Sequence, residues 1–338
     1  MKFLIKRMAL VLIFIFISIG FSQVVSADSN NFSVTPVLPE NQALDNPSYF
    51  DLTVTPNQKQ ILQIKIKNNS DESVKYKVYV NTATTNQNGI IDYSMSDFEK
   101  DESMKLSVED CVKLSEPQIE VPAESEKEVS IELSIPETPF EGVALGGITI
   151  EPIVEETQGV SSIFTRTLAI QLRESDEEVF PQLESGNVLI SQENLRNNIQ
   201  FELRNITPTV ISGVNAEITV TKKGAKEPVF EQQKEKLNFA PNSKFSLLSQ
   251  WNDQFKSGEY VYKISLIDGK GNTWDFHKEF EVKAKEAKKL NETSVDKKKI
   301  SIKDKDYLVY IEIAVIVVIA LVIWMILKKI KVNSDFLK

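Results

Sequence analysis

The sequence predicts an all-β chain with two tandem immunoglobulin-like antiparallel β-sandwich domains. Period-2 alternation of apolar and polar residues recurs from Phe32 onward, turn residues separate the runs, and no helical period of any length interrupts them. Short strands at this spacing are typical of sandwiches. We expect an N-terminal signal peptide and one C-terminal transmembrane helix at the two ends of the chain.

Residues 1–27 have the three parts of a secretory signal peptide. Positive charges among the first seven residues precede an apolar stretch, residues 8–21, and small residues follow at positions 25–27. Cleavage after Ala27 would leave an exported chain that starts near Asp28.

Residues 307–327 are predicted to form the transmembrane helix. At about 1.5 Å per residue this stretch spans the roughly 30 Å hydrocarbon core of a bilayer. Glu312 is its single charge and lies near the outer end, where a carboxylate can reach the headgroups. The lysines of the tail, residues 328–338, place that tail in the cytoplasm. The anchor residues that we expect are Leu308, Glu312, Trp324 and Leu327.

The composition argues against nucleic-acid binding and against disulfide bonds within the chain. The chain has 39 Lys and Arg residues against 48 Asp and Glu, a net charge of −9, which argues against nucleic acid as a partner. A single cysteine, Cys111, allows no internal disulfide and suits a Gram-positive surface protein. Its apolar neighbours identify Cys111 as a core residue.

The first domain is predicted over residues 28–153. Residues 62–66 and 74–80 alternate as two half-buried strands, which we expect to pair as a hairpin across the polar turn between them. Residues 129–135 form a further strand that Pro136 ends.

Five residues of this domain are candidates for binding a ligand or partner strand. Asn86, Asn88 and Gly89 form a tight-turn signal, and Gly146 and Gly147 permit close approach of another backbone. Turn and bulge geometry alone is the alternative explanation.

Four segments together resemble the WxL-interacting protein family of Gram-positive cell surfaces. They are residues 32–42 (FSVTPVLPENQ), 49–56 (YFDLTVTP), 81–89 (NTATTNQNG) and 140–148 (FEGVALGGI). The resemblance implies that the first domain is the family's peptidoglycan-binding domain.

A linker at residues 154–162 leads to the second domain, which we expect over residues 160–282. Its predicted strands begin with residues 168–172, and its last hairpin turns at residues 268–272. Residues 240–245 (APNSKF) and 257–260 (SGEY) resemble landmarks of the same family's host-binding domain.

Residues 283–306 are predicted to be a Lys-rich stalk. The segment has too few apolar residues to offset its ordering entropy, although residues 282–290 could start as a helix.

The sequence contains no catalytic constellation, so we expect no enzyme activity, cofactor or metal. His277 is the only histidine, which excludes His/Cys zinc clusters. Residues 268–272 lack the later ligands of a calcium loop and indicate a hairpin turn. No carboxylate pair is singled out by its spacing.

These observations and the resemblance predict a membrane-anchored scaffold or adhesion protein at the cell surface. It would cross the membrane once, with most of the chain outside the cell. The resemblance implies three partners: peptidoglycan, secreted WxL-type proteins and a host extracellular-matrix protein. The alternative is a cell-wall-processing subunit, either non-catalytic or carboxylate-based. A receptor is disfavoured because the tail is too short to fold.

Overall fold

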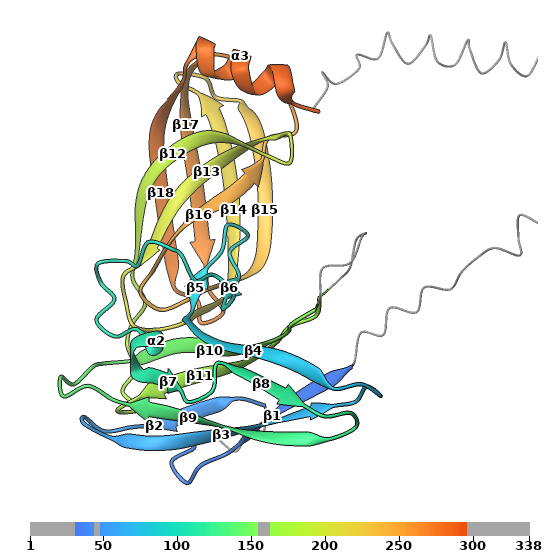
Figure 1. The fold of residues 1–338 in the computed structure, drawn as a ribbon. Helices are drawn as coiled ribbons and strands as arrows, with labels where there is room; N and C mark the ends of the chain where they lie inside the picture. Colours follow the sequence, from blue (N-terminus) through green and yellow to red (C-terminus); the bar gives the residue numbers. More distant parts are fainter. Residues whose placement is uncertain (1–30, 44–47, 155–162, 296–338) are drawn as a thin grey trace, which may run out of the picture. The chain divides into compact units, whose positions relative to one another are not determined.

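The computed structural model describes residues 31–43, 48–154 and 163–295, which form two compact units. The first unit contains the described residues up to Val80 together with 109–137 and 147–170, and the second contains 81–108, 138–146 and the described residues from 171 onward. Both are built from β-sheets, which confirms the all-β, sandwich-like prediction (Figure 1).

The two predicted terminal elements lie outside the described residues. These are the signal peptide (1–27) and the transmembrane helix (307–327) with its residues Leu308, Glu312, Trp324 and Leu327. Among the residues that the structure describes, no helix combines the length and apolarity needed to cross a membrane.

The first unit is built on two sheets. The four-stranded sheet has the order β1-β3-β9-β7, and the five-stranded sheet has the order β2-β11-β10-β4-β8. Inward side chains such as Ile64, Ile131 and Ile148 are fully buried, because alternate residues of each strand face the core. The strands are β1 (Phe32–Val37), β2 (Phe50–Thr53), β3 (Lys59–Asn68), β4 (Val74–Thr82), β7 (Val112–Leu114), β8 (Gln118–Val121), β9 (Glu126–Ser134), β10 (Val143–Pro152) and β11 (Arg166–Arg173); a short helix, α2 (Val108–Cys111), precedes β7.

The expected hairpin between residues 62–66 and 74–80 is wrong, although both strands exist. β3 pairs with β1 and β9 in one sheet, whereas β4 pairs with β8 in the other. Alternation shows which face of a strand is buried and does not show which strand lies beside it. Both strands face the core, as expected, but from different sheets.

The sequence predicts that residues 168–172 open the second domain, whereas the structure places strand β11 in a sheet of the first unit. It lies between β2 and β10 in the five-stranded sheet. The apolar residues of β11 (Leu168, Ile170 and Leu172) are buried. The sheet of the first unit is therefore completed by a strand that comes after the predicted linker.

The second unit has one three-stranded sheet and one four-stranded sheet, with the orders β12-β13-β16 and β15-β14-β17-β18. The hairpin predicted at residues 268–272 is confirmed, because β17 pairs with β18. Asp268 holds its turn by accepting hydrogen bonds from the backbone N–H groups of Lys270 and Asn272. The strands are β12 (Leu183–Glu193), β13 (Arg196–Asn205), β14 (Ile211–Lys222), β15 (Pro228–Phe239), β16 (Ser243–Gln250), β17 (Gly258–Ile267) and β18 (Thr273–Val282).

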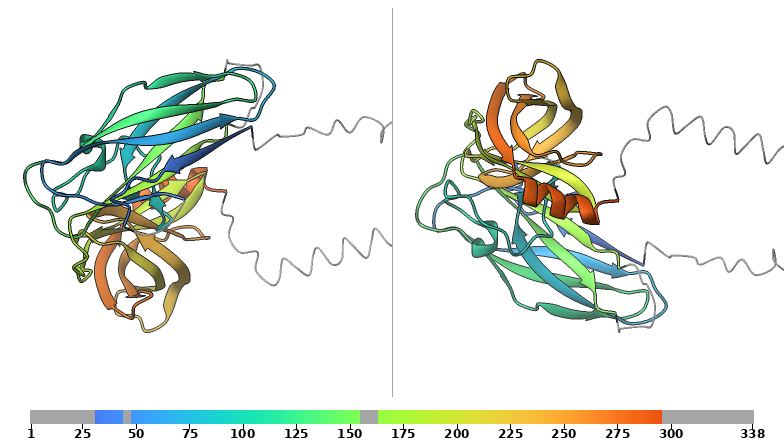
Figure 2. Two further views of the ribbon diagram at one scale, coloured as in Figure 1. Left: turned by 90° about the horizontal axis from the view of Figure 1, so that it is seen from below. Right: turned by 90° about the horizontal axis from the view of Figure 1, so that it is seen from above.

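The first part of the predicted Lys-rich stalk is folded. Residues Ala284–Thr293 form helix α3, which lies across one end of the second unit (Figures 1 and 2). Ala287 is buried, and Leu290 packs against the core of the unit. Because these two residues lie on one face of the helix, they form a small apolar stripe that packs a segment otherwise rich in lysine against the unit. Residues 296–306 of the stalk lie outside the described residues.

Residues 81–108 belong to the second unit, although the sequence places them in the middle of the first domain. Within this segment, β5 (Thr84–Thr85) pairs with β6 (Ile91–Asp92) and contacts both β15 and β16. The N–H of Leu248 donates to the carbonyl of Gln87 at 2.8 Å, and the N–H of Asn238 donates to that of Gly89 at 2.8 Å. One tight turn thus hydrogen-bonds to strands of both sheets.

A largely buried ion pair between Arg204 and Asp101 holds the C-terminal part of this segment. Arg204 on β13 donates to both carboxylate oxygens of Asp101, at 2.6 and 3.0 Å, and the Asp101 side chain has no solvent exposure. Burial favours the neutral acid, but hydrogen bonds from Arg204 and Ser103 outweigh burial and lower the pKa of Asp101 to about 2. Glu102 and Glu184 complete the acidic surroundings of Arg204.

We predict that the chain tolerates a cut at residues 155–162 but does not tolerate the loss of β11. A protease site inserted there should give two fragments that co-elute under native conditions, because β11 stays hydrogen-bonded between β2 and β10. A chain ending at residue 153 lacks β11 and should show poor amide dispersion in NMR spectra. Separation of the nicked fragments without denaturant would contradict the assignment of β11.

We predict that Asp101→Asn loosens residues 81–108. The lowered pKa corresponds to about 2 kcal/mol of stabilisation, which is fully present above pH 4 and is lost as the pH falls toward 2. Hydrogen exchange at the N–H groups of Leu248 and Asn238 should quicken roughly 30-fold at neutral pH.

The matched control is Glu102→Gln, because Glu102 contacts the same arginine but its side chain is 84% exposed. That variant should change exchange little. Equal effects of the two substitutions would show that the burial of Asp101 is not what holds the segment.

Candidate functional site

The turn predicted at Asn86–Gly89 exists. The side chain of Asn86 is engaged in hydrogen bonds within the turn. The side-chain oxygen of Asn86 accepts hydrogen bonds from the N–H groups of Asn88 and Ile90, at 3.0 and 3.3 Å. Gly89 has φ +74°, a conformation that glycine adopts without strain. The Asn-Gly signal therefore identified the turn correctly.

The same turn packs inward. Gly89 is buried, and a Cβ added there would lie 3.1 Å from the side chain of Leu237 and 3.3 Å from that of Leu247. Gly146 and Gly147 are buried in β10. Of the five candidate residues, only Asn88 is exposed. Ligand binding by these residues stays a prediction, and Asn88 is the one with a side chain free to carry it.

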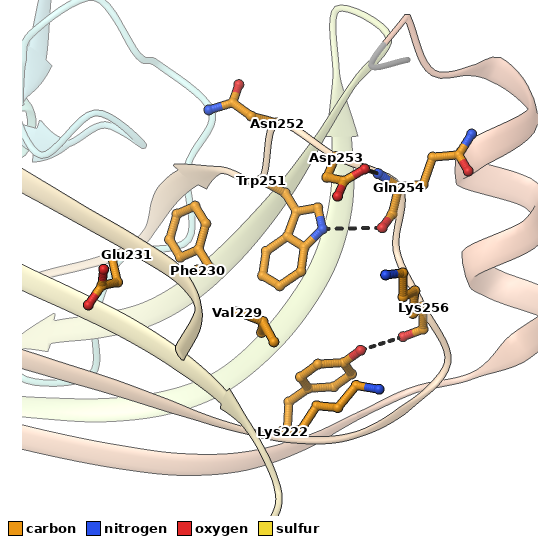
Figure 3. A pocket seen from close by; sticks show the side chains of 10 residues that line it. Lys222, Val229, Phe230, Glu231, Trp251, Asn252, Asp253, Gln254 and Lys256 are labelled. Carbon is orange, nitrogen blue, oxygen red and sulfur yellow. Dashed lines mark hydrogen bonds between the residues drawn. The ribbon is translucent and has the colours of Figure 1, made fainter. Parts of the chain in front are cut away.

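An aromatic pocket that the sequence did not suggest lies in the second unit. It has a volume of about 410 Å³ and is formed by the ends of β14 and β15, the loop after β16 and the start of β17. Phe230 and Trp251 stack with ring centroids 5.3 Å apart, and Val229, 48% exposed, lies beside them (Figure 3). Tyr260 meets Trp251 edge-on at 6.4 Å.

Positively and negatively charged side chains line the same pocket. The pocket is lined by two lysines, Lys222 and Lys256, and by two acids, Glu231 and Asp253. Asn252 and Gln254 add amide groups. Within the described part of the chain, the side chains of Lys222, Glu231 and Asn252 make no hydrogen bond or ion pair. The pocket therefore offers hydrogen-bond donors and acceptors that have no partner within the described residues, and its positive and negative side chains are equal in number.

The loop that carries Trp251 is held from two sides. The buried Asn197 of β13 accepts from the N–H of Trp251 at 2.9 Å and donates to the carbonyl of Asp253 at 2.9 Å. Asn291 of α3 donates to the carbonyl of Phe255 at 2.8 Å and accepts from its N–H at 2.9 Å. Two asparagines from distant parts of the sequence thus fix residues 251–255 before any ligand binds.

Sequence reasoning missed this pocket because its parts have no common motif. Each aromatic residue of the pocket lies near one end of an alternating run: Phe230, Trp251 and Tyr260. At such a position a large ring can belong to the hydrophobic core as well as to a binding site. The one signal available was the polar stretch Asn252-Asp253-Gln254 directly after a tryptophan.

The one histidine and the one cysteine of the chain both lie among the described residues. Among them, no group of three or more His, Cys, Asp or Glu side chains could hold a metal ion. His277 lies exposed on β18. Burial, aided by Asp110, raises the pKa of the Cys111 thiol to about 11, so that it is neutral at physiological pH.

Several solved structures with some similarity to this chain come from fimbrial assembly. A chaperone-tip adhesin complex of CFA/I fimbriae matches with 12% identity and a TM-score of 0.33, over 73% of this chain and 98% of that one. The class 5 fimbriae chaperone CfaA matches with 16% identity and a TM-score of 0.29, over 74% and 98%. The Pseudomonas aeruginosa CupB2 chaperone matches with 14% identity and a TM-score of 0.26, over 67% and 95%. Similarity at this level carries no argument about this chain.

Family models give a clear result. No curated protein matches the sequence significantly. The model of the WxL Interacting Protein peptidoglycan binding domain matches residues 32–152, and that of the WxL Interacting Protein host binding domain matches residues 155–292. The two domains occur in the predicted order and together cover most of the chain. This chain belongs to the WxL-interacting protein family.

Proposed function

We propose that this protein is a membrane-anchored, non-enzymatic scaffold or adhesion protein of a Gram-positive cell surface. Its two immunoglobulin-like domains bind peptidoglycan and secreted WxL-type proteins, with a host extracellular-matrix protein as a further partner. The observation that carries this proposal is the match of the two family domains, in order, over residues 32–152 and 155–292.

The predicted ends of the chain fit this role. A cleaved signal peptide, residues 1–27, would export the chain, and a helix at residues 307–327 would hold it in the cell membrane with the binding domains outside. The net charge of −9 disfavours nonspecific attraction to anionic wall polymers, so wall binding would depend on specific contacts.

Asn88 is the residue of the predicted binding turn that can meet a partner directly. It is exposed and lies beside a backbone that β15 and β16 hold rigidly. A rigid turn loses little conformational entropy when it binds, which favours recognition. Gly89 would then support binding by shape, because its φ and its contacts exclude a larger residue.

The test is sedimentation of the full chain, in detergent, with purified insoluble cell wall and with culture-secreted proteins of the same organism. We expect the chain to sediment with the wall and to retain at least one secreted protein. Absence of both would refute the proposal, and release of soluble wall fragments would favour a wall-processing subunit instead.

Variants of the turn test the site within the same assay. Asn88→Ala should weaken retention of a ligand about fivefold, the loss expected for one hydrogen bond of about 1 kcal/mol. Lys226→Ala, in the exposed turn between β14 and β15, is the matched control and should bind normally. Unchanged binding by a folded Asn88→Ala variant would remove this turn from the site.

A further inference from the structure

The second unit contains a built pocket that neither its family nor its sequence motifs explain. We propose that the aromatic pocket around Trp251 binds a neutral saccharide of one or two sugar rings. Four properties of the pocket favour such a ligand: its size, the chemistry of its walls, the balance of its charges and the rigidity of the loop that forms it.

The size of the pocket fits a small, compact ligand. Its volume of about 410 Å³ lies at the lower end of the range for small-molecule sites, roughly 300–1,000 Å³. A polyproline-type peptide would need an extended groove of aromatic residues, whereas this pocket is a single hollow between one loop and the ends of three strands.

The walls of the pocket contain both apolar rings and hydrogen-bonding groups. A sugar ring has C–H groups on its faces and hydroxyl groups around its edge, so it needs both kinds of surface in one site. Phe230, Trp251 and Val229 supply the apolar part (Figure 3). Asn252, Asp253 and Gln254 also line the pocket and bring amide and carboxylate groups to it. Hydroxyl groups both donate and accept, which matches a lining that contains donors and acceptors.

The charge balance argues for a neutral ligand. Lys222 and Lys256 oppose Glu231 and Asp253, so that the lining carries no net charge. A site for a phosphate, a carboxylate or an amine would be expected to have an excess of the opposite sign. These four groups can instead act as strong hydrogen-bond partners for hydroxyl groups.

The pocket is formed before a ligand arrives. Asn197 and Asn291 hold the backbone of residues 251–255, and Trp251 is further fixed by its stacking on Phe255 at 5.4 Å. Asn252 adopts φ 56°, a left-handed conformation that Asn tolerates, and its side chain is exposed at the pocket. Such preorganisation lowers the entropic cost of binding a weakly interacting ligand.

This inference rests on the proposed function only in taking the second unit as a partner-binding one. A saccharide carried by a wall polymer or by a host glycoprotein would present the same ring to the pocket. Free sugars report on the pocket alone, whereas sedimentation with wall reports on the whole chain, so the two proposals fail in distinguishable ways.

The experiment uses the full chain labelled with 5-fluorotryptophan, in a detergent whose headgroup contains no sugar. The chain has three tryptophans, so ¹⁹F NMR should show three resonances, and Trp251→Phe assigns the one from the pocket. Glucose, galactose, N-acetylglucosamine, lactose and cellobiose are titrated separately. Glucosamine, glucuronate and decaproline serve as comparators.

We expect at least one neutral saccharide to shift the Trp251 resonance saturably below about 10 mM and to leave Trp274 and Trp324 unchanged. The proposal is overturned if no neutral saccharide does so. It is equally overturned if glucosamine, glucuronate or decaproline binds as tightly as the best neutral sugar.

Two conservative variants keep the test independent of misfolding. Asn252→Gly preserves the left-handed backbone and Asp253→Asn preserves the shape of the side chain, and each should weaken binding about tenfold with the Trp251 resonance still present. Lys263→Ala, exposed on β17 and outside the pocket, is the control and should bind like the native chain. Binding that is unchanged in both pocket variants would assign the sugar to another site.

Discussion

The contact between Asp101 and Arg204 is the interaction on which the organisation of the second unit depends. Asp101 has a fully buried side chain, and its charge is tolerated because Arg204 donates to both of its oxygens and Ser103 donates a further hydrogen bond. This pair fixes one end of residues 81–108, while the carbonyls of Gln87 and Gly89 fix the turn. Near the start of the segment, Ala83 joins Leu145 and Ala240 in a small apolar cluster.

Neither compact unit is a single continuous stretch of the chain. Residues 81–108 leave the family's first domain to pack in the second unit, and β11 lies outside that domain but completes a sheet of the first unit. A family domain describes what is inherited together along the sequence, and a compact unit describes what is buried together. In this protein the two descriptions differ at both segments.

The sequence predicts the elements of this fold better than their partners. Alternation identified β3, β4, β9 and β11, because the buried face of a strand is recorded in its own residues. It could not place β3 and β4 in different sheets, since either arrangement buries the same side chains. The turn at Asn86–Gly89 was likewise predictable from local chemistry, whereas its contact with Leu237 depends on a strand far along the chain.

Helix α3 shows why the pocket was beyond sequence reasoning. The sequence predicts a Lys-rich spacer that could begin as a helix at residues 282–290, and in the structure Ala287 and Leu290 seat that helix on the core. Once seated, the helix brings Asn291 within hydrogen-bond distance of both backbone groups of Phe255. Asn197 acts on the same loop from β13, and it lies 94 positions before Asn291, far beyond the reach of any local turn or periodicity signal. The position of Trp251 therefore depends on two amides whose roles become visible only when the chain is folded.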